Sequence, residues 1–303
     1  MKVLVYGHKG WIGEQVCKLL ESSNHTVVRG EVRVNNKKDL EWEILNSGCT
    51  NIMSFIGRTH GKIGDKEYTT IDYLEEEGKI YENVRDNLFS PIVLSLLAKK
   101  HNKHFTYLGT GCIFKFDDKH PFGEEVNGFD EDAEPNFFDS SYSIVKGFTD
   151  ELMHFFDSNT LNLRIRMPIT ECKSKRNFIT KITTYEKICS VPNSMSVLPE
   201  LLPMAIDMAK KKITGTVNLT NPGLISHNEI LEMYKEIVDP SFEWKNFTIE
   251  EQSKILAAGR SNNYLDTTRL KRLYPMVNNI KDSVRQALIN MKNREDSLIN
   301  QKL

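Results

Sequence analysis

The stretch KVLVYGHKGWIGEQVCKLL, from Lys2 to Leu20, decides the fold. It begins with an apolar run of strand length and ends with a run whose apolar residues recur at helical spacing. Gly7, Gly10 and Gly13 stand between the two runs as G-x-x-G-x-x-G. Such a turn lets a pyrophosphate approach the helix N-terminus, although a turn required only for packing can have the same spacing. The stretch therefore predicts a strand, a glycine turn and a helix that together bind a dinucleotide.

Strand and helix signals continue to alternate along the first half of the chain. Apolar runs at 26–30, 51–57, 103–109 and 161–167 predict strands, and runs with helical periodicity at 39–47, 87–101 and 142–156 predict helices. This alternation predicts an α/β protein with a Rossmann-type, doubly wound parallel sheet that is covered by helices on both faces.

The pattern changes after Pro168, where a polar segment precedes a helix at 200–212 and a strand at 215–221. Ser226 and Glu229 then form a capping box that opens another helix. We expect residues 1–168 to form the nucleotide-binding domain, with 200–226 returning to it. Residues 169–199 and 227–303 are expected to form a smaller C-terminal substrate-binding lobe.

Composition excludes several classes of protein. The 303 residues carry 40 Lys and Arg against 41 Asp and Glu, a net charge of -1, which argues against nucleic acid and anionic membranes as partners. No apolar run reaches the ~20 residues of a membrane span, and the histidines and cysteines lack the spacing of a metal site. Five scattered cysteines indicate a reducing compartment, so we expect a soluble cytoplasmic protein. They are Cys17, Cys49, Cys112, Cys172 and Cys189.

The end of the second predicted strand bears on cofactor choice. Arg29 and Arg33 suit the 2'-phosphate of NADPH, whereas Glu31 between them suits the ribose of NADH, and either arginine can equally be a surface charge. We favour NADPH and leave NADH open. The cofactor-binding residues we expect are Gly7, Gly10, Trp11, Ile12, Gly13, Arg29, Arg33, Gly57, Tyr142 and Lys146.

Tyr142 and Lys146 form a Y-x-x-x-K pair that lies on one face of a helix. The lysine can favour ionisation of the phenol, which then protonates a carbonyl that receives hydride. The pair alone is common on helix surfaces. Together with the glycine turn and Thr110, it resembles the extended short-chain dehydrogenase/reductase family, and the resemblance gives all three residues that family's catalytic roles.

Cys112, in the run GTGCIF, has no place in hydride chemistry. It would suit an enzyme that both reduces and epimerises a keto sugar. The 4-keto group of such a sugar makes the protons on the neighbouring carbons acidic, so a thiolate can remove one of them and an acid can return a proton on the other face. Lys181, in RNFITKI, is a candidate acid. The alternative is that Cys112 is a small buried apolar residue.

Longer runs carry a more specific resemblance. GTGCIF, PNFFDSSYSIVK, RNFITKI, TNPGLISHNEILEMY and RSNNYLD are similar to the plant-type bifunctional UDP-4-keto-6-deoxy-D-glucose 3,5-epimerase/4-keto-reductases, which make UDP-L-rhamnose. The resemblance covers most of 107–266 and weakens from Arg58 to Gly78. It implies Cys112 and Lys181 as the epimerase pair, NADPH, a cytosolic setting and a separate 4,6-dehydratase that supplies the keto sugar.

Further expectations concern substrate and assembly. We expect Asn87, Arg176, Asn177 and Arg260 to bind substrate, although Asn87 is most simply a helix N-cap and the arginines can be surface charges. The family implies a homodimer. Two other functions remain open: a plain nucleotide-sugar 4-reductase or 4-epimerase, and a non-catalytic NADP-binding regulatory subunit.

Overall fold

The computed structural model of the protein describes residues 1–300, which divide into two compact units. Unit 1 comprises residues 1–113, 132–164 and 202–217. Unit 2 comprises 114–131, 165–201 and the described part of 218–303. The segment 114–131, which the sequence placed in the first domain, packs in unit 2 because its backbone pairs there: Phe129 donates to Tyr264 and Phe116 to Asn262.

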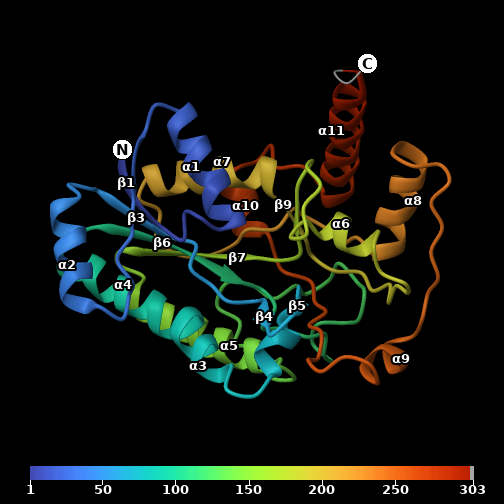
Figure 1. The fold of residues 1–303 in the computed structure, drawn as a ribbon, viewed down its shortest axis with the longest axis horizontal. Coiled ribbons are helices and arrows are strands. Elements are labelled where there is room, and N and C mark those ends of the chain that lie inside the picture. The colour runs from blue at the N-terminus through green and yellow to red at the C-terminus, as the bar shows by residue number, and fades with distance from the viewer. Residues whose placement is uncertain (301–303) are drawn as a thin grey trace. The chain divides into compact units, whose positions relative to one another are not determined.

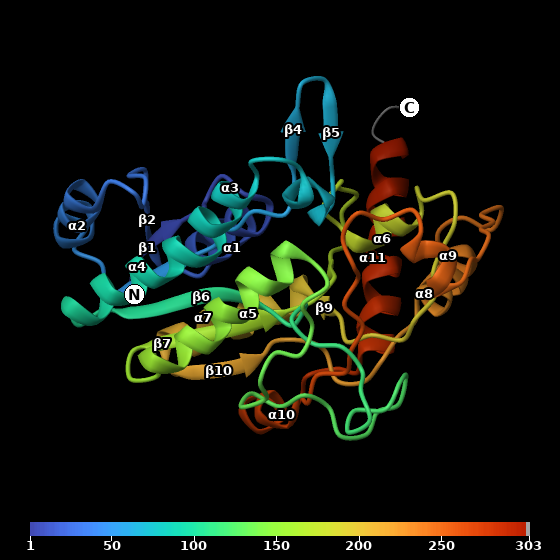
Figure 2. The same cartoon turned by 90° about the horizontal axis from the view of Figure 1, so that it is seen from below.

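A six-stranded sheet forms the centre of unit 1 (Figure 1). Its order is β10-β7-β6-β3-β1-β2, and β1 pairs in parallel with both β2 and β3. Helices α1 and α7 cover one face, and α4 and α5 cover the other (Figures 1 and 2). The doubly wound sheet expected from the alternating pattern is therefore confirmed. The strands are β1 (Lys2–Tyr6), β2 (Thr26–Arg29), β3 (Asn51–Ser54), β6 (His104–Thr110), β7 (Thr160–Ile165) and β10 (Gly215–Asn218).

The strand order reverses between β1 and β3. From β1 the chain moves outward to β2, and it then returns to β3 on the other side of β1. The carboxyl ends of β1 and β3 thus form the crevice where open α/β sheets bind ligands. The glycine turn begins at this point, directly after Tyr6.

The helices of unit 1 agree with the sequence except around Asn87. The helical segment begins at Ile80, runs through a wide π turn and continues to Lys100, so Asn87 lies inside it and the N-cap interpretation was wrong. Pro91 lacks an N–H group, and the Asn87 carbonyl, which that N–H would reach in an α-helix, instead accepts from Thr149 Oγ1 at 2.7 Å. The helices are α1 (Trp11–Ser22), α2 (Lys37–Asn46), α3 (Ile80–Val84), the π turn η2 (Arg85–Phe89), α4 (Ser90–Lys100) and α5 (Ser141–Met153).

A small hairpin occupies the region of weakest resemblance. Strands β4 (Gly61–Ile63) and β5 (Lys66–Tyr68) pair antiparallel and project from unit 1 (Figure 2). A 3-10 turn, η1 (Ile71–Glu75), follows them. The sequence of this region has no clear strand signal, and the hairpin was not predicted.

Unit 2 packs short elements around the long helix α11. The predicted capping box is confirmed: Ser226 Oγ accepts from Glu229 N, and a carboxylate oxygen of Glu229 accepts from Ser226 N. Ile230 of α8 and Leu288 of α11 are fully buried in the core of this unit. Helix α7 (Leu198–Lys210) begins in unit 2 and continues from Leu202 in unit 1. The other elements of unit 2 are β8 (Pro168–Ile169), α6 (Phe178–Ile182), β9 (Ser196–Val197), α8 (His227–Ile237), α9 (Ile249–Ser253), α10 (Thr268–Leu273) and α11 (Ile280–Asn300).

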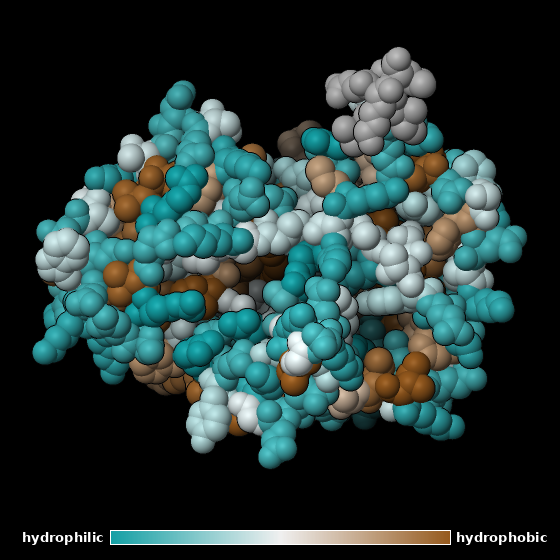
Figure 3. Space-filling model, in the orientation of Figure 1, coloured by the Kyte–Doolittle hydropathy of each residue, from teal (hydrophilic) through white to brown (hydrophobic). Residues whose placement is uncertain are grey.

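The surface of the protein is mostly hydrophilic. The face shown in Figure 3 is covered mostly by hydrophilic side chains, with hydrophobic residues in smaller groups. Within residues 1–300, none of the helices has the length and apolar character needed to span a bilayer.

Candidate active site

The glycine turn has no room for side chains. Gly7 has a φ of +74°, and a Cβ atom there would lie 2.6 Å from the carbonyl carbon of Phe55, next to β3. A Cβ at Gly13 would lie 2.2 Å from the carbonyl oxygen of Gly7. Helix α1 begins at Trp11, and no side chain caps its N-terminus. Its first N–H groups are therefore available to an anion such as a pyrophosphate.

Glu31, which follows β2, contacts the glycine turn. Its carboxylate accepts a hydrogen bond from Lys9 Nζ at 2.7 Å and lies 3.3 Å from His8 Nε2. The hydrogen bond from Lys9 holds the pKa of the Glu31 carboxyl below its usual range. Arg29 instead pairs with Glu21 of α1 at 2.7 Å, and Arg33 is exposed. Sequence reasoning missed Lys9, although a lysine within a glycine turn was a signal.

The structure brings Thr110, Cys112 and Tyr142 together where β6 meets α5. Ser140 caps α5, which presents Tyr142 in its first turn. The Thr110 hydroxyl hydrogen-bonds to the Tyr142 phenol, but burial dominates and raises the pKa of Tyr142 above its ordinary value. A tyrosine that keeps its proton suits the acid of a ketone reduction.

Lys146 lies one turn after Tyr142 and is almost completely buried. Burial lowers the pKa of Lys146 to about 8, and the charges of Asp150 and Cys112 oppose that shift. Its ammonium donates a hydrogen bond to the phenol oxygen of Tyr107 on β6. The sequence analysis did not identify Tyr107, because no motif marks it.

The backbone of Cys112 is fixed on both sides. Its N–H donates to Thr110 Oγ1 at 3.1 Å, and its carbonyl accepts from Ser143 Oγ at 2.7 Å. Its side chain packs against an apolar cluster that includes Tyr142 and Tyr73. The side chain of Cys112 is thus held beside Tyr142, and the residue remains partly exposed.

The segment after the hairpin covers this group of residues. Tyr73 and Leu74 of η1 pack with Tyr142 in the apolar cluster. The carboxylate of Glu75 accepts hydrogen bonds from the backbone N–H and the hydroxyl of Ser141, at 2.8 and 2.9 Å. A segment outside the sequence motifs therefore contacts α5 directly.

In unit 2, the structure brings Lys181, Arg176 and Arg260 together. Lys181 lies on the short helix α6. Burial lowers the pKa of Lys181 to about 8, and the charges of both arginines lower it further. A lysine with such a pKa can donate a proton near neutral pH. The cluster also has the charge that a diphosphate requires.

Asn177 and Asn87 both have structural contacts. Asn177 is fully buried and caps α6; its oxygen accepts from Ile179 N, and its amide donates to the Thr170 and Cys172 carbonyls. Asn87 is also buried and bonds to both the N–H and the carbonyl of Arg58. A Cβ at Gly57 would lie 3.4 Å from its side-chain oxygen. These contacts fix the loops around the predicted sites. The side-chain amides of both asparagines are therefore already hydrogen-bonded within the protein.

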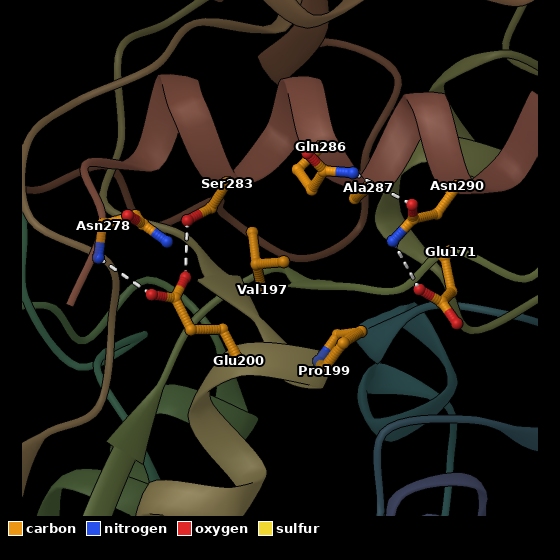
Figure 4. Close-up of a pocket in the computed structure, with 9 residues that line it drawn as sticks. All are labelled: Glu171, Val197, Pro199, Glu200, Asn278, Ser283, Gln286, Ala287 and Asn290. Carbon is orange, nitrogen blue, oxygen red and sulfur yellow. Dashed lines mark hydrogen bonds between the residues drawn. The ribbon is translucent and has the colours of Figure 1, made fainter. Parts of the chain in front are cut away.

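A separate cavity in unit 2 has a volume of about 120 Å³ and lies between α11 and the start of α7 (Figure 4). Glu200 accepts from Asn278 N and Ser283 Oγ there, and Glu171 accepts from Asn290. The cavity contains none of the predicted site residues, and its carboxylates are bonded within the protein.

Comparisons with known proteins show two strong relatives. A crystal structure of a UDP-rhamnose synthase from Acanthamoeba polyphaga mimivirus has 51% sequence identity and a TM-score of 0.91, over 96% of this chain and 99% of that chain. The bifunctional dTDP-4-dehydrorhamnose 3,5-epimerase/reductase of Arabidopsis thaliana is 42% identical over 282 residues, which are 93% of this chain and 90% of that protein. No protein-family model matches.

Two further matches are limited, one by its coverage of the relative and the other by its low sequence identity. A trifunctional UDP-glucose 4,6-dehydratase/3,5-epimerase/reductase of Arabidopsis thaliana is 40% identical over 285 residues, which are 94% of this chain but 41% of that protein. The dTDP-4-dehydrorhamnose reductase of Bacillus anthracis, solved in complex with NADP, shares the fold at 15% identity and a TM-score of 0.74, over 95% of this chain and 97% of that chain. The identity and coverage of the stronger relatives decide the assignment: this chain belongs to the bifunctional 3,5-epimerase/4-keto-reductase family of rhamnose nucleotide synthesis, within the extended short-chain dehydrogenases/reductases.

Proposed function

We propose that the protein converts UDP-4-keto-6-deoxy-D-glucose to UDP-L-rhamnose in two half-reactions. The observation that carries the proposal is the grouping of Thr110, Cys112, Tyr142 and Lys146 between β6 and α5. This group combines three residues suited to the reduction of a carbonyl with a thiol suited to epimerisation. The Arabidopsis thaliana relative is named for both the epimerase and the reductase activity.

In the first half-reaction, Cys112 as thiolate removes a proton from C3 or C5 of the sugar, and Lys181 returns one to the opposite face. The 4-keto oxygen holds the enolate charge between the two transfers. Thr110 supplies a hydroxyl to that oxygen. Arg176 and Arg260 are proposed to bind the diphosphate.

In the second half-reaction, Tyr142 gives its proton to O4 as the ketone becomes an alcohol. Bound NADPH supplies the hydride that C4 receives. Lys146 stabilises the negative charge that develops on the Tyr142 oxygen. The glycine turn and the N-terminus of α1 are proposed to hold the pyrophosphate, and Lys9 and Arg33 offer cations to the 2'-phosphate.

NADH remains a possible second reductant because Glu31 can accept hydrogen bonds from free ribose hydroxyls. The keto sugar must come from a 4,6-dehydratase. We also propose a reducing, cytoplasmic setting, which is supported by five cysteines that form no disulfide.

We propose a homodimer formed through α5. Its outer face exposes a row of apolar side chains at helical spacing, and a two-fold axis would bury the row against itself. Light scattering should give twice the chain mass, and Phe148→Glu should give a monomer. A wild-type monomer at micromolar concentration would contradict the dimer. The row consists of Ile144, Phe148 and Leu152 on α5 and continues to Phe155 in the 3-10 turn η3 (His154–Phe156).

Product analysis tests the function. The protein is incubated with UDP-4-keto-6-deoxy-D-glucose and NADPH in deuterated water, and the product is identified by NMR. The proposal predicts UDP-L-rhamnose with deuterium at C3 and C5. An unlabelled 6-deoxy sugar of D configuration would leave only a reductase, and a failure to consume NADPH would favour a regulatory subunit.

A further inference from the structure

The contact between Lys146 and Tyr107 joins the catalytic helix to the centre of the sheet. Tyr107 lies on β6, three residues before Thr110, and only 1% of its surface is exposed. Lys146 Nζ donates to its phenol oxygen and lies 4.6 Å from the centre of its ring. The amine is therefore held at the oxygen end of the ring.

A buried ammonium needs acceptors because it has lost its water. Lys146 is 5% exposed. Asp150 lies one turn further along α5, but its carboxylate is engaged by Arg164 at 2.5 and 3.0 Å and also accepts from Asn162 at 2.8 Å. Asp150 and Cys112 therefore act on Lys146 through their charges, whereas the phenol oxygen of Tyr107 is the direct hydrogen-bond partner of the amine.

We propose that Tyr107 is a positioning residue for the reduction: its phenol oxygen fixes the Lys146 ammonium near Tyr142 and keeps it charged where water is excluded. The inference rests on the proposed function, because it assigns Lys146 to the reductase half-reaction. Tyr107 itself touches neither substrate nor cofactor in this account.

The burial of Tyr107 favours a role as a hydrogen-bond acceptor over a role in proton transfer. Burial raises the pKa of Tyr107 well above its ordinary value, so the phenol keeps its own proton at any pH where the enzyme works. Its buried place in β6 also offers no exit to solvent. Tyr107 therefore accepts a hydrogen bond and does not pass a proton onward.

The test is Tyr107→Phe, which keeps the ring and removes the acceptor. Lys146 should lose its charge at lower pH, so the alkaline limb of the kcat profile for ketone reduction should move down by about one pH unit. At pH 6 kcat should stay within about threefold of wild type, and KM for NADPH within about twofold. Tyr234→Phe, which removes another buried phenol on α8, is the control and should not move the limb.

A second readout does not depend on turnover. The Cε resonance of Lys146, assigned by its loss in Lys146→Met, should titrate about one pH unit lower in Tyr107→Phe than in wild type. An unchanged titration and an unmoved limb would overturn the proposal, and so would an equal loss of kcat at every pH. If the wild type does not reduce the ketone, the proposed function fails, and the titration still decides the role of Tyr107.

Discussion

Lys146, to which we assign a catalytic role, lowers the stability of the folded protein because its charge is buried. Its pKa is about 8 in the folded protein and about 10.5 when solvated. Between these values the unfolded chain binds more protons than the folded one, so the contribution of Lys146 makes stability rise as pH increases from about 8 to about 10.5. Below pH 8 its buried charge opposes folding.

Lys146→Met should therefore stabilise the protein while it abolishes reduction. We expect the free energy of unfolding to rise by about 1–3 kcal/mol at pH 7, and the gain to shrink above pH 8 as the wild-type lysine becomes neutral. Urea denaturation at pH 7, 8.5 and 9.5 measures this. Lys62→Met, at an exposed site on the hairpin, is the matched control. A gain that did not change with pH would contradict the electrostatic explanation.

Glu31 provides a second residue-scale prediction, on cofactor choice. Glu31→Gln removes the charged acceptor for ribose hydroxyls, so kcat/KM with NADH should fall about tenfold. The same variant frees Lys9 from its ion pair, so kcat/KM with NADPH should stay equal or rise. Steady-state kinetics with both cofactors measures the ratio. A larger loss with NADPH than with NADH would show that Glu31 does not face the ribose.

Candidate site residues that belong to short motifs could be predicted from the sequence, whereas residues that are defined by a distant partner could not. Tyr142 and Lys146 were found because they share one helix face. Tyr107 and Lys9 were missed because their partners, Lys146 and Glu31, lie 39 and 22 positions away, and only the folded chain brings them together. No local pattern encodes such a contact.

Steric limits at the glycine turn give a prediction at the element scale. A Cβ at Gly13 would lie 2.2 Å from the Gly7 carbonyl oxygen, whereas one at Gly10 would lie 3.2 Å from the same atom. Gly13→Ala must therefore displace the turn from α1 and should weaken NADPH binding at least about tenfold. Gly10→Ala requires a smaller shift and should bind more tightly than Gly13→Ala. Fluorescence titration measures both, and the reverse order would contradict the geometry.

The hairpin supports a further element-scale prediction. A Cβ at Gly61 would lie 2.3 Å from the ring of Tyr73, which is buried and bonded to Glu82 and therefore cannot easily move. Gly61→Ala should push the hairpin away and loosen the cluster around Tyr142. We expect kcat for reduction to fall about fivefold or more. Lys62→Ala, on the next residue, should match wild type; equal rates for both variants would show that the hairpin does not support the site.

Element boundaries were predictable where a local signal set them. The capping box of α8 was visible in the sequence and is formed as expected. The π turn before Pro91 was not, because an asparagine near a proline also fits a helix start. The hairpin β4–β5 was missed because its strands have only three residues each, too few to show a period.

At the scale of the whole molecule, the predicted site residues divide between the two units. Thr110, Cys112, Tyr142 and Lys146 belong to unit 1, and Lys181 belongs to unit 2. The sequence predicted a sheet domain and a second lobe, but it placed residues 114–131 in the first. Their backbone pairs with residues more than 130 positions later, and strand periodicity does not reveal such pairing.

Tyr142→Phe should separate the two half-reactions that we propose for this chain. This variant is incubated with UDP-4-keto-6-deoxy-D-glucose and NADPH in deuterated water beside Cys112→Ala, and each sugar is analysed by NMR. We predict that Tyr142→Phe places deuterium at C3 and C5 of the ketone while NADPH consumption falls at least about 100-fold, and that Cys112→Ala incorporates no label while it still binds NADPH. Deuterium incorporation by Cys112→Ala at the wild-type rate would contradict the proposed epimerisation. A complete loss of deuterium incorporation in Tyr142→Phe would contradict the separation of the two half-reactions.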